Sequence, residues 1–294
     1  MKLYDQPCAS AAMRLHVQAL EARAEDYRVL HRLPHADEIW LSPTPSTGAV
    51  TLGVIDCETT GLTDTDRMVE LALAKIVIGD GQVVDIKPPI SMLEDPCMPL
   101  SEDVRRVTGL NDEDLWGHSF DENLLATELG DVDVLVAFNS AFDTRFVRQR
   151  FPHIRHPWIC ALWDFDWAGA GYQSRNQTGL LAERGHFYTA HRAAADAWAL
   201  LVLIANPAPD GRAIAAHLVE RGQQIDVRVS AAGAPFHVKD DLKAAGYRWQ
   251  PDRRVWRIDV AEADATAQVD FLRALHPLIR PVVQEVDWYN RHCR

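Results

Sequence analysis

The feature that most constrains the fold of this chain is a short apolar run, Val50 to Ile55, that leads directly into Asp56-Cys57-Glu58. An apolar run followed by a Thr-Thr-Gly turn predicts a buried strand whose end opens on a functional edge of a sheet. Side chains two residues apart point to the same face of a strand, so Asp56 and Glu58 should project together. Two carboxylates this close repel each other unless a cation lies between them, and a divalent metal is the simplest such cation. On these residues alone, a solvated acidic pair without a function is the alternative.

The segments after this strand alternate between strand and helix patterns. Residues 67–78 and 82–86 predict a hairpin about a Gly-Asp-Gly turn, and residues 133–138 predict a second buried strand. Serine, asparagine and aspartate residues that can cap helices precede several helical patterns. The predicted helices cover residues 101–107, 112–116, 121–129, 143–150, 177–184 and 191–204. Strands that alternate with helices, with functional groups at the strand ends, predict an α/β fold.

Length and turn-forming segments predict four parts of the chain. At 294 residues the chain is too long for one small domain. Residues 1–46 form an N-terminal helical segment, with a helix from about residue 10 to residue 33 that Pro34 ends. The main domain is expected over residues 47–206, a linker helix over 207–222, and a small α+β domain over 223–294.

Composition limits the classes of partner and compartment. A net charge of -12 argues against wholesale binding to polyanions, so nucleic acid would have to be met by local basic patches or through bound cations. The five cysteines are scattered and contain no CxxC pair, which indicates a reducing compartment and no structural zinc. The sequence starts without a signal-peptide pattern, and its longest apolar run, Ala197 to Ala205, is too short to span a bilayer. We therefore expect a cytoplasmic protein with no membrane partner.

Two further carboxylates and a histidine occur at the ends of apolar segments. Asp143 follows the strand predicted at residues 133–138, and Asp196 lies on an apolar helix, five residues after His191. Five residues of helix rotate a side chain by about 140°, so His191 and Asp196 cannot share a helical face. We therefore expect His191 in the loop or first turn before the helix, and Asp196 fixed on the helix.

Three segments carry these residues: Asp-Cys-Glu-Thr-Thr-Gly-Leu at 56–62, Ala-Phe-Asn-Ser-Ala-Phe-Asp at 137–143, and His-Arg-Ala-Ala-Ala-Asp at 191–196. In order and spacing they resemble the three motifs of the DEDDh exonuclease family, which includes the proofreading epsilon subunit of bacterial DNA polymerase III. The likeness covers about residues 50 to 205. Thr108-Gly109-Leu110 also resembles the Thr-Gly loop between the first two motifs of that family. A tyrosine at position 192 would mark the sister DEDDy group, but that residue is Arg192.

The resemblance implies a ribonuclease H-like mixed sheet flanked by helices and a two-metal active site. Hydrolysis of a phosphodiester needs a nucleophile, charge neutralisation at phosphorus and help for the leaving oxygen, and two metals about 4 Å apart supply all three. The hard ions Mg²⁺ and Mn²⁺ prefer oxygen ligands. By resemblance, two such ions are held by Asp56, Glu58, Asp143 and Asp196. His191 would take the proton from the attacking water, a task that suits histidine because its unperturbed pKa of about 6.5 leaves it largely neutral at pH 7.

The resemblance also implies a set of contacts to the terminal nucleotide. The matching positions are Thr59, Gly61, Leu62, Thr108, Asn139 and Phe142. Ordinary packing is the alternative for Leu62 and Phe142, because apolar and aromatic side chains usually belong to the core. A basic run, Arg145 to Arg155, either grips the strand backbone or forms a solvated face.

Together these motifs predict a metal-dependent 3′-to-5′ exonuclease that releases nucleoside 5′-monophosphates from single-stranded 3′ ends, with DNA favoured over RNA. The chain has no room for a polymerase domain, so the enzyme is either free-standing or acts with a polymerase or repair partner. One alternative is trimming of RNA 3′ ends by the same chemistry. The 2′-hydroxyl of the terminal nucleotide would distinguish RNA from DNA. A non-catalytic module that binds nucleic acid or a polymerase is another, but loss of a ligand or of the histidine would have favoured it, and none is lost.

The C-terminal segment has a different charge balance from the rest of the chain. Residues 221–260 hold eight Lys or Arg against five Asp, within a protein of net charge -12. The hairpin there carries Tyr247, Trp249 and Trp256, so a platform for nucleic acid is one interpretation. A small domain with these aromatic residues in its core and its arginines in water is the other interpretation.

Overall fold

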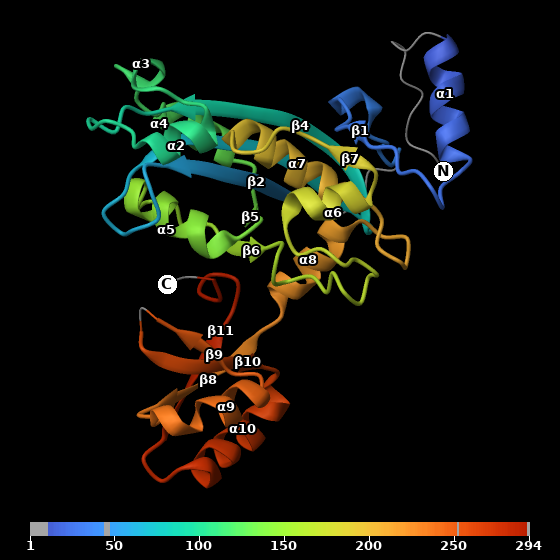
Figure 1. Ribbon diagram of the computed structural model, residues 1–294. Coiled ribbons are helices and arrows are strands. Elements are labelled where there is room, and N and C mark those ends of the chain that lie inside the picture. The colour runs from blue at the N-terminus through green and yellow to red at the C-terminus, as the bar shows by residue number, and fades with distance from the viewer. Residues whose placement is uncertain (1–10, 44–47, 252, 293–294) are drawn as a thin grey trace. The chain divides into compact units, whose positions relative to one another are not determined.

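The computed structural model describes residues 11–43, 48–251 and 253–292. The chain divides into two compact units, residues 1–219 and residues 220–294 (Figure 1). The boundary falls within α8 (Ile214–Gln223). The first ten residues of the predicted N-terminal segment, and residues 44–46 at its end, lie outside the described residues.

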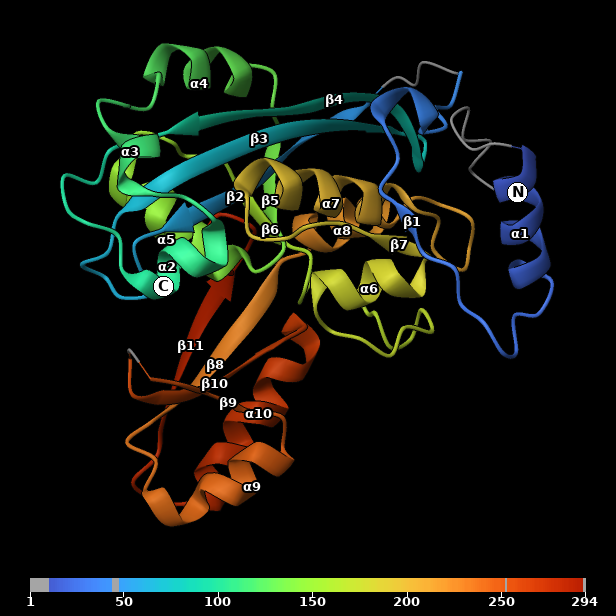
Figure 2. The same cartoon turned by 45° about the horizontal axis from the view of Figure 1, so that its top comes forward.

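A mixed five-stranded sheet forms the centre of the first unit (Figures 1 and 2). Its inner strand, β2, pairs antiparallel with one hairpin strand and parallel with a strand from the second half of the unit. The parallel half follows from connections through helices, whereas a two-residue turn allows the antiparallel hairpin. In spatial order the strands are β4 (Gln82–Leu93), β3 (Met68–Gly79), β2 (Val50–Thr59), β5 (Val134–Ala137) and β6 (Trp158–Cys160).

Helices cover both faces of this sheet, because its strands carry apolar side chains on both faces. Phe146 of one helix, α5, packs with Ile55 and Leu135 in the larger core cluster. On the opposite face, Ala193 and Ala197 of α7 pack against Ala72 of β3, where small side chains allow a close approach. This arrangement confirms the predicted α/β class with a mixed sheet flanked by helices. The helices of this unit are α1 (Ala11–Glu21), α2 (Glu102–Thr108), α3 (Asp112–Leu115), α4 (Glu122–Leu129), α5 (Ser140–Arg150), α6 (Gln177–Glu183), α7 (Ala193–Ala205) and α8, with a short 3₁₀ turn η1 (Ala36–Glu38).

Local signals in the sequence account for most of these boundaries. The hydroxyl of Ser101 accepts a hydrogen bond from Val104 N and so caps α2, which ends at Gly109 in the left-handed region with φ of 71°. These are the cap types that serine and glycine favour. The carboxylate of Asp121 accepts from two backbone amides and caps α4 in the same way.

The predicted N-terminal helix over residues 10–33 is wrong beyond Glu21, where α1 ends. The chain turns over residues 22–26 and then forms β1 (His31–Arg32), which pairs parallel with β7 (His186–Phe187). Pro34 disfavours helical geometry at the residue before it, and pairing with β7 satisfies the backbone groups that a helix would have used. The helical periodicity of this segment could not show that a distant strand competes for it.

The second unit is a four-stranded antiparallel sheet with helices packed on one face. Val229 and Ala231 of the central strand pack with Leu242 and Leu272 of the two helices. The predicted small α+β fold is therefore confirmed. Its elements are β8 (Asp226–Ala232), η2 (Phe236–Val238), α9 (Lys239–Ala244), β9 (Arg248–Gln250), β10 (Val255–Val260), α10 (Glu262–Leu275) and β11 (Arg280–Val286).

Among the described residues, no helix combines the length and the apolar character needed to cross a membrane.

Substitution of a core residue tests the packing of the first unit. Leu135 of β5 is fully buried in the larger cluster, so Leu135→Ala should lower the free energy of unfolding by roughly 2–5 kcal/mol, through lost transfer energy and a cavity. Leu15 on α1 is exposed, so the matched change Leu15→Ala should stay within about 0.5 kcal/mol. Urea unfolding monitored by circular dichroism measures both, and equal effects of the two changes would contradict this assignment of the core.

Candidate active site

Strand β2 carries the first two candidate residues on the face that α7 covers. Ile55 and Cys57 belong to the core cluster on the α5 side, so Asp56 and Glu58 point to the other face. A bulge follows directly, since the pairing of β2 with β3 shifts between Glu58 and Thr59. Bulges of this kind re-aim side chains beside functional sites. The alternation predicted from the sequence therefore holds in the structure.

Helix α7 brings the third carboxylate to this pair. One oxygen each from Asp56, Glu58 and Asp196 lie within 4.8 Å of one another. The carboxylate of Asp196 is fixed from both sides: its Oδ1 accepts from the Tyr188 hydroxyl at 2.6 Å, and its Oδ2 accepts from the backbone N of His191 at 2.6 Å. Asp196 is thus held beside the acidic pair of β2 by fixed donors.

The fourth carboxylate, Asp143, lies in the first turn of α5 and is only 4% exposed. The Cys57 thiol donates to its Oδ1 at 3.3 Å, from the side of β2 opposite to the acidic pair. The charge of Asp143 contributes to raising the pKa of Asp56, after burial. The structure therefore brings Asp143 to the edge of the same group of carboxylates.

His191 lies two residues before α7, and its side chain is exposed. Its backbone has φ of 71°, a left-handed conformation that few residues other than glycine adopt. The hydrogen bond from its own N to Asp196 holds this conformation. The sequence placed His191 in the loop or first turn before the helix, and the structure has it there.

A fifth carboxylate, Glu70 of β3, belongs to the site and was missed in the sequence. It pairs directly with Glu58 across the strands and is 1% exposed. The Arg192 guanidinium donates to it at 3.0 and 3.2 Å, and the backbone N of Ala193 donates at 3.2 Å. Glu70 thus ties the start of α7 to the sheet. The signal available in the sequence was one Glu inside the apolar run Val-Glu-Leu-Ala-Leu, whose partner only the fold reveals.

Burial and mutual repulsion perturb the protonation of these groups. Burial, followed by the charges of Asp143 and Asp196, raises the pKa of Asp56 well above its usual range. Burial, followed by the charges of Asp196 and Glu70, raises the pKa of Glu58 to about 8. Burial also raises the pKa of Asp143 to about 7. Without a cation, this site therefore favours bound protons at neutral pH.

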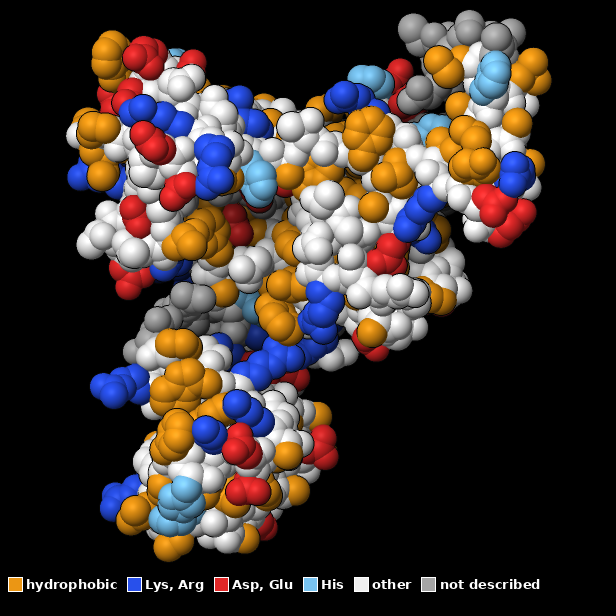
Figure 3. Space-filling view, viewed as in Figure 1, with side chains coloured by type: hydrophobic (Ala, Val, Ile, Leu, Met, Phe, Trp, Pro, Cys, Tyr) orange, Lys and Arg blue, Asp and Glu red, His pale blue; other side chains and the backbone are white. Residues whose placement is uncertain are grey.

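The donor set fits a hard divalent cation. The clustered atoms of Asp56, Glu58 and Asp196 are all carboxylate oxygens, which such ions prefer over nitrogen or sulfur. A cation would also relieve the repulsion that raises these pKa values. The acidic cluster therefore indicates divalent metal binding. Figure 3 shows acidic side chains (red) and histidine (pale blue) on one face of this unit.

The six predicted substrate contacts differ in what their side chains already do. The Thr59 hydroxyl donates to the carbonyl of Gly61, and the Thr108 hydroxyl donates to the carbonyl of Val104. A β-carbon at Gly61 would meet the Asp66 carboxylate oxygens at 2.7 Å, so a larger residue there would displace Asp66 from its hydrogen bonds to Thr60 and Thr63. These three residues shape the two loops.

The other three predicted contacts are more accessible. Leu62 is 77% exposed, and Asn139 is exposed and makes no side-chain cap to α5. Phe142 is half-buried and packs against Phe146, with ring centroids 4.9 Å apart, so packing accounts for it at least in part.

The basic run on α5 is largely engaged within the protein. Arg145 donates to Asp64 and to the carbonyl of Leu62, and its guanidinium lies over the Phe146 ring. Arg150 forms ion pairs with Glu94 and Glu122. These two arginines therefore brace loops around the site, and their charges are already balanced.

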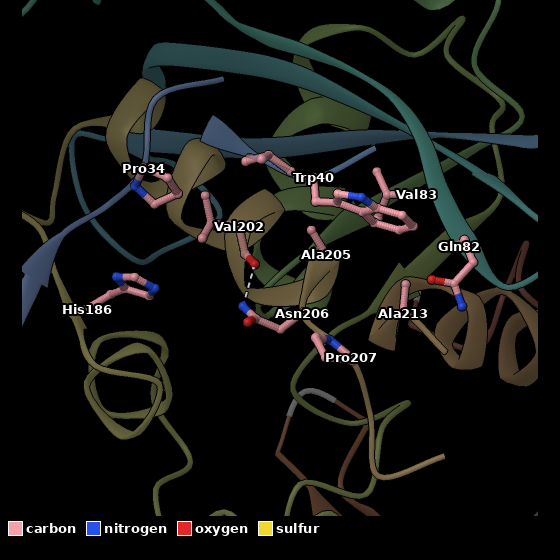
Figure 4. A pocket seen from close by; sticks show the side chains of 11 residues that line it. Pro34, Trp40, Gln82, Val83, His186, Val202, Ala205, Asn206, Pro207 and Ala213 are labelled. Carbon is pink, nitrogen blue, oxygen red and sulfur yellow. Dashed lines mark hydrogen bonds between the residues drawn. The ribbon is translucent and has the colours of Figure 1, made fainter. Parts of the chain in front are cut away.

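A separate apolar pocket of about 280 Å³ lies in the first unit (Figure 4). Trp40, Val83, Val202 and Ala205 are among its lining residues, and no Asp or Glu lines it. Its polar lining side chains are Gln82, His186 and Asn206, so it lacks the group of carboxylates found on β2 and α7. The chemistry of this unit therefore belongs to the carboxylates.

Comparison with known proteins gives one family match. The family model of RNase T, described as Exonuclease, matches residues 54–203. The search of curated proteins found no match. The family model describes exonucleases as a group and does not distinguish the epsilon subunit from its relatives.

Solved structures of exonucleases are among the matches to this chain. Exonuclease X in complex with 5′ overhanging duplex DNA has 24% identity and a TM-score of 0.40, over 52% of this chain and 89% of that one. Exonuclease I from Methylocaldum szegediense has 16% identity and a TM-score of 0.40, over 53% of this chain and 40% of that one. Exonuclease I in its apo form has 16% identity and a TM-score of 0.44, over 81% of this chain and 64% of that one.

The hydroxyl that orients Asp196 can be tested by metal binding. Tyr188→Phe should weaken Mn²⁺ affinity by roughly 10- to 100-fold, because a ligand that loses its fixed donor is no longer oriented. Tyr172→Phe is the matched control, since the Tyr172 hydroxyl is buried and has no hydrogen-bond partner among the described residues. Isothermal titration calorimetry with Mn²⁺ measures both. Unchanged affinity in Tyr188→Phe would mean that the Tyr188 hydroxyl does not orient a metal ligand.

The raised pKa values predict a pH-dependent stability in the absence of metal. The folded values of about 8 for Glu58 and about 7 for Asp143 lie above those of the unfolded chain, so the folded protein binds more protons. Its stability should therefore fall as the pH rises from about 5 to about 8. Thermal unfolding in EDTA across this range measures the effect, and Mn²⁺ should reverse it most at the alkaline end. Asp143→Asn should flatten the dependence, and a flat profile in the unaltered protein would refute the predicted direction.

Proposed function

This chain belongs to the RNase T family of DEDD-type 3′-to-5′ exonucleases, and we propose that it degrades single-stranded DNA to nucleoside 5′-monophosphates. The observation that carries the proposal is the meeting of Asp56, Glu58 and Asp196 within 4.8 Å, with Asp143 buried beside them. His191, exposed at the start of α7, completes the set that this chemistry requires.

Asp56, Glu58, Asp143 and Asp196 would hold two Mg²⁺ or Mn²⁺ ions. When bound, such ions neutralise charge at phosphorus and lower the pKa of water. Asp196 would hold its ion in a fixed place, because the Tyr188 hydroxyl and the backbone N of His191 donate to its carboxylate, and Gln177 donates to its backbone carbonyl. Such fixed positioning lowers the entropic cost of reaching the transition state.

His191 would act as the general base that accepts the proton of the attacking water. Its left-handed backbone turns the side chain out of the helix, and its backbone N–H remains bonded to Asp196. Because the side chain is exposed, it can approach a substrate and later release the proton to solvent.

The 3′-terminal nucleotide would be met by the exposed residues at the ends of β2 and β5. Leu62 offers an apolar edge and Asn139 an amide that no cap occupies. Neither contact reads a base sequence, which suits an enzyme that removes every nucleotide in turn. A polymerase or repair protein acting in trans would supply the substrate end.

RNA 3′-end trimming is the second candidate, because the same carboxylates and histidine would serve both sugars. The terminal 2′-hydroxyl is the group that separates the two substrates. The presence of all four carboxylates and His191 argues against a module that only binds nucleic acid.

Digestion of matched 5′-labelled single-stranded DNA and RNA tests the proposal. With Mg²⁺ or Mn²⁺ the protein should shorten DNA from its 3′ end, and EDTA should stop the reaction. His191→Ala should lower the rate by roughly 10²- to 10⁴-fold, the usual contribution of a general base. Asp143→Asn should remove activity, because it removes a negative ligand from the site.

Matched controls come from exposed residues of the same types. His118→Ala and Asp103→Asn alter groups that take no part in the carboxylate cluster, so both should retain full activity. Faster digestion of RNA than of DNA would favour the second candidate. Intact strands with every metal, together with retained binding, would refute the enzymatic proposal.

A further inference from the structure

Arg192 joins the proposed base to helix α7 and points its side chain toward the sheet. It is the N-cap residue of α7, with an extended backbone, and His191 precedes it. Its Nε donates to Glu70 Oε2 at 3.0 Å, and its Nη2 donates to Glu70 Oε1 at 3.2 Å. Two parallel hydrogen bonds of this kind fix the plane of a guanidinium group as well as its position. Arg192 is therefore held in one orientation.

Glu70 is a rigid anchor for this guanidinium group. Its side chain is buried, and the Ser91 hydroxyl donates to its Oε1 at 2.9 Å. The backbone N of Ala193 donates to its Oε2 at 3.2 Å. A buried carboxylate that is bonded to several fixed donors has little freedom to move. The bond from Ala193 already joins α7 to β3, and Arg192 adds to this join a positive group in a fixed place.

The second edge of the guanidinium group remains accessible. A guanidinium group has five N–H donors, and the contact with Glu70 uses one on Nε and one on Nη2. Within the part of the chain that the structure describes, the side chain of Arg192 makes hydrogen bonds to no other residue. This side chain is 46% exposed, whereas that of Glu70 is 1% exposed, so its exposed part is the side away from Glu70. The outer edge, formed by Nη1 and Nη2, therefore offers the remaining donors.

The guanidinium group of Arg192 lies close to the candidate metal ligands. Glu70 is directly opposite Glu58 in the pairing of β2 with β3, and such residues have β-carbons about 5 Å apart. One oxygen of Glu58 lies within 4.8 Å of oxygens of Asp56 and Asp196. Burial and neighbouring carboxylates raise the pKa of Glu58 to about 8, and the charge of Arg192 opposes this rise. The outer edge of Arg192 is therefore near the place where a phosphate would meet the ions.

Arg192 already has a counter-charge in Glu70. Its hydrogen bonds to Glu70 raise the pKa of Arg192, burial opposes this rise, and the charges of Glu70, Asp114 and Glu58 add to it. Asp114 itself accepts from the backbone N of Asn111 at the start of α3. Because Glu70 balances its charge, Arg192 contributes to the site through directed N–H donors more than through net charge. An oxyanion is the ligand that best matches such a pair of donors.

We propose that Arg192 binds the non-bridging oxygens of the phosphate that this site cleaves, and that Glu70 is the residue that positions it. The outer edge of the guanidinium group presents parallel N–H donors, which match phosphate oxygens in geometry and charge. Donors that are fixed before the substrate binds need no reorganisation when negative charge develops at phosphorus. The inference rests on the proposed function for the identity of the ligand as a nucleotide phosphate.

Isothermal titration calorimetry of thymidine 5′-monophosphate with the full chain, in saturating Mn²⁺, tests this inference. Arg192→Gln should weaken binding roughly 10- to 100-fold, the usual contribution of hydrogen bonds to a charged group. Thymidine, which lacks the phosphate, should bind to the variant and to the unaltered protein alike. Equal losses of affinity for the two ligands, or no loss for either, would overturn the inference.

The alternative is that Arg192 only anchors α7 to the sheet. Glu70→Gln weakens the same anchor but keeps a carbonyl oxygen that can accept from Arg192. Glu70→Gln and Arg192→Gln should therefore lower the urea midpoint of unfolding similarly, whereas affinity for thymidine 5′-monophosphate should fall less in Glu70→Gln. Equal falls in affinity would assign only an anchoring role to the pair and would refute the phosphate contact.

A lysine variant and a remote arginine complete the comparison. Arg192→Lys keeps the charge but has a single ammonium group in place of two edges, so its affinity should remain below that of the unaltered protein. Full recovery in this variant would refute the two-edge geometry. Arg23 is exposed and forms an ion pair with Asp26, so Arg23→Gln is the matched control and should bind as the unaltered protein does. A loss as large as that of Arg192→Gln would overturn the assignment.

A chromogenic substrate separates this inference from the proposed function. The unaltered protein with Mn²⁺ should hydrolyse the p-nitrophenyl ester of thymidine 5′-monophosphate, and Arg192→Gln should lower kcat roughly 10²- to 10³-fold, as loss of one donor to a developing negative charge does. A normal kcat in this variant would count against the inference alone. Failure of the unaltered protein to cleave the ester would count against the proposed chemistry, whereas calorimetry would still decide whether Arg192 contacts the phosphate.

Discussion

Repulsion among buried carboxylates is the physical constraint that shapes the site of the main unit. Asp56, Glu58, Asp143 and Asp196 are gathered where burial alone would disfavour charge, and their proximity raises the pKa values further. Such a group is stable only if protons or cations balance it. Folding therefore carries an unfavourable electrostatic free energy at this site, and a bound cation would reduce it. A divalent cation would reduce this cost, whereas a neutral ligand would not.

The scaffold holds these charges by using both faces of one strand. Even-numbered residues of β2 carry the acidic pair toward α7, while Cys57 points to α5 and donates to Asp143. On the α7 side, the Arg192 guanidinium neutralises Glu70, which would otherwise add a further charge opposite Glu58. The neighbouring residues thus orient the ligands and also limit the net negative charge.

The two units differ in the balance of their charges. Residues 1–219 hold 18 Lys or Arg and 31 Asp or Glu, an excess of negative charge that concentrates cations but repels a polyanionic substrate. The second is nearly balanced, with twelve Lys or Arg and eleven Asp or Glu over residues 220–294. Bound divalent cations at the carboxylates would reduce this repulsion at the site itself.

The sequence by itself determined the features that rest on local periodicity and spacing. Alternation in β2 placed Asp56 and Glu58 on one face, helical rotation placed His191 before α7, and caps such as Ser101 and Gly109 set the helix ends. The ligand set itself came from the likeness of three motifs to a known family. Only the tertiary structure decided which distant groups meet. It ended α1 early because β1 pairs with β7, it brought Glu70 and Tyr188 to the site, and it buried Tyr247 in the core of the second unit. The physical reason is that periodicity fixes the face of a residue within its own element, whereas its partners depend on the pairing of strands and helices far apart in the chain.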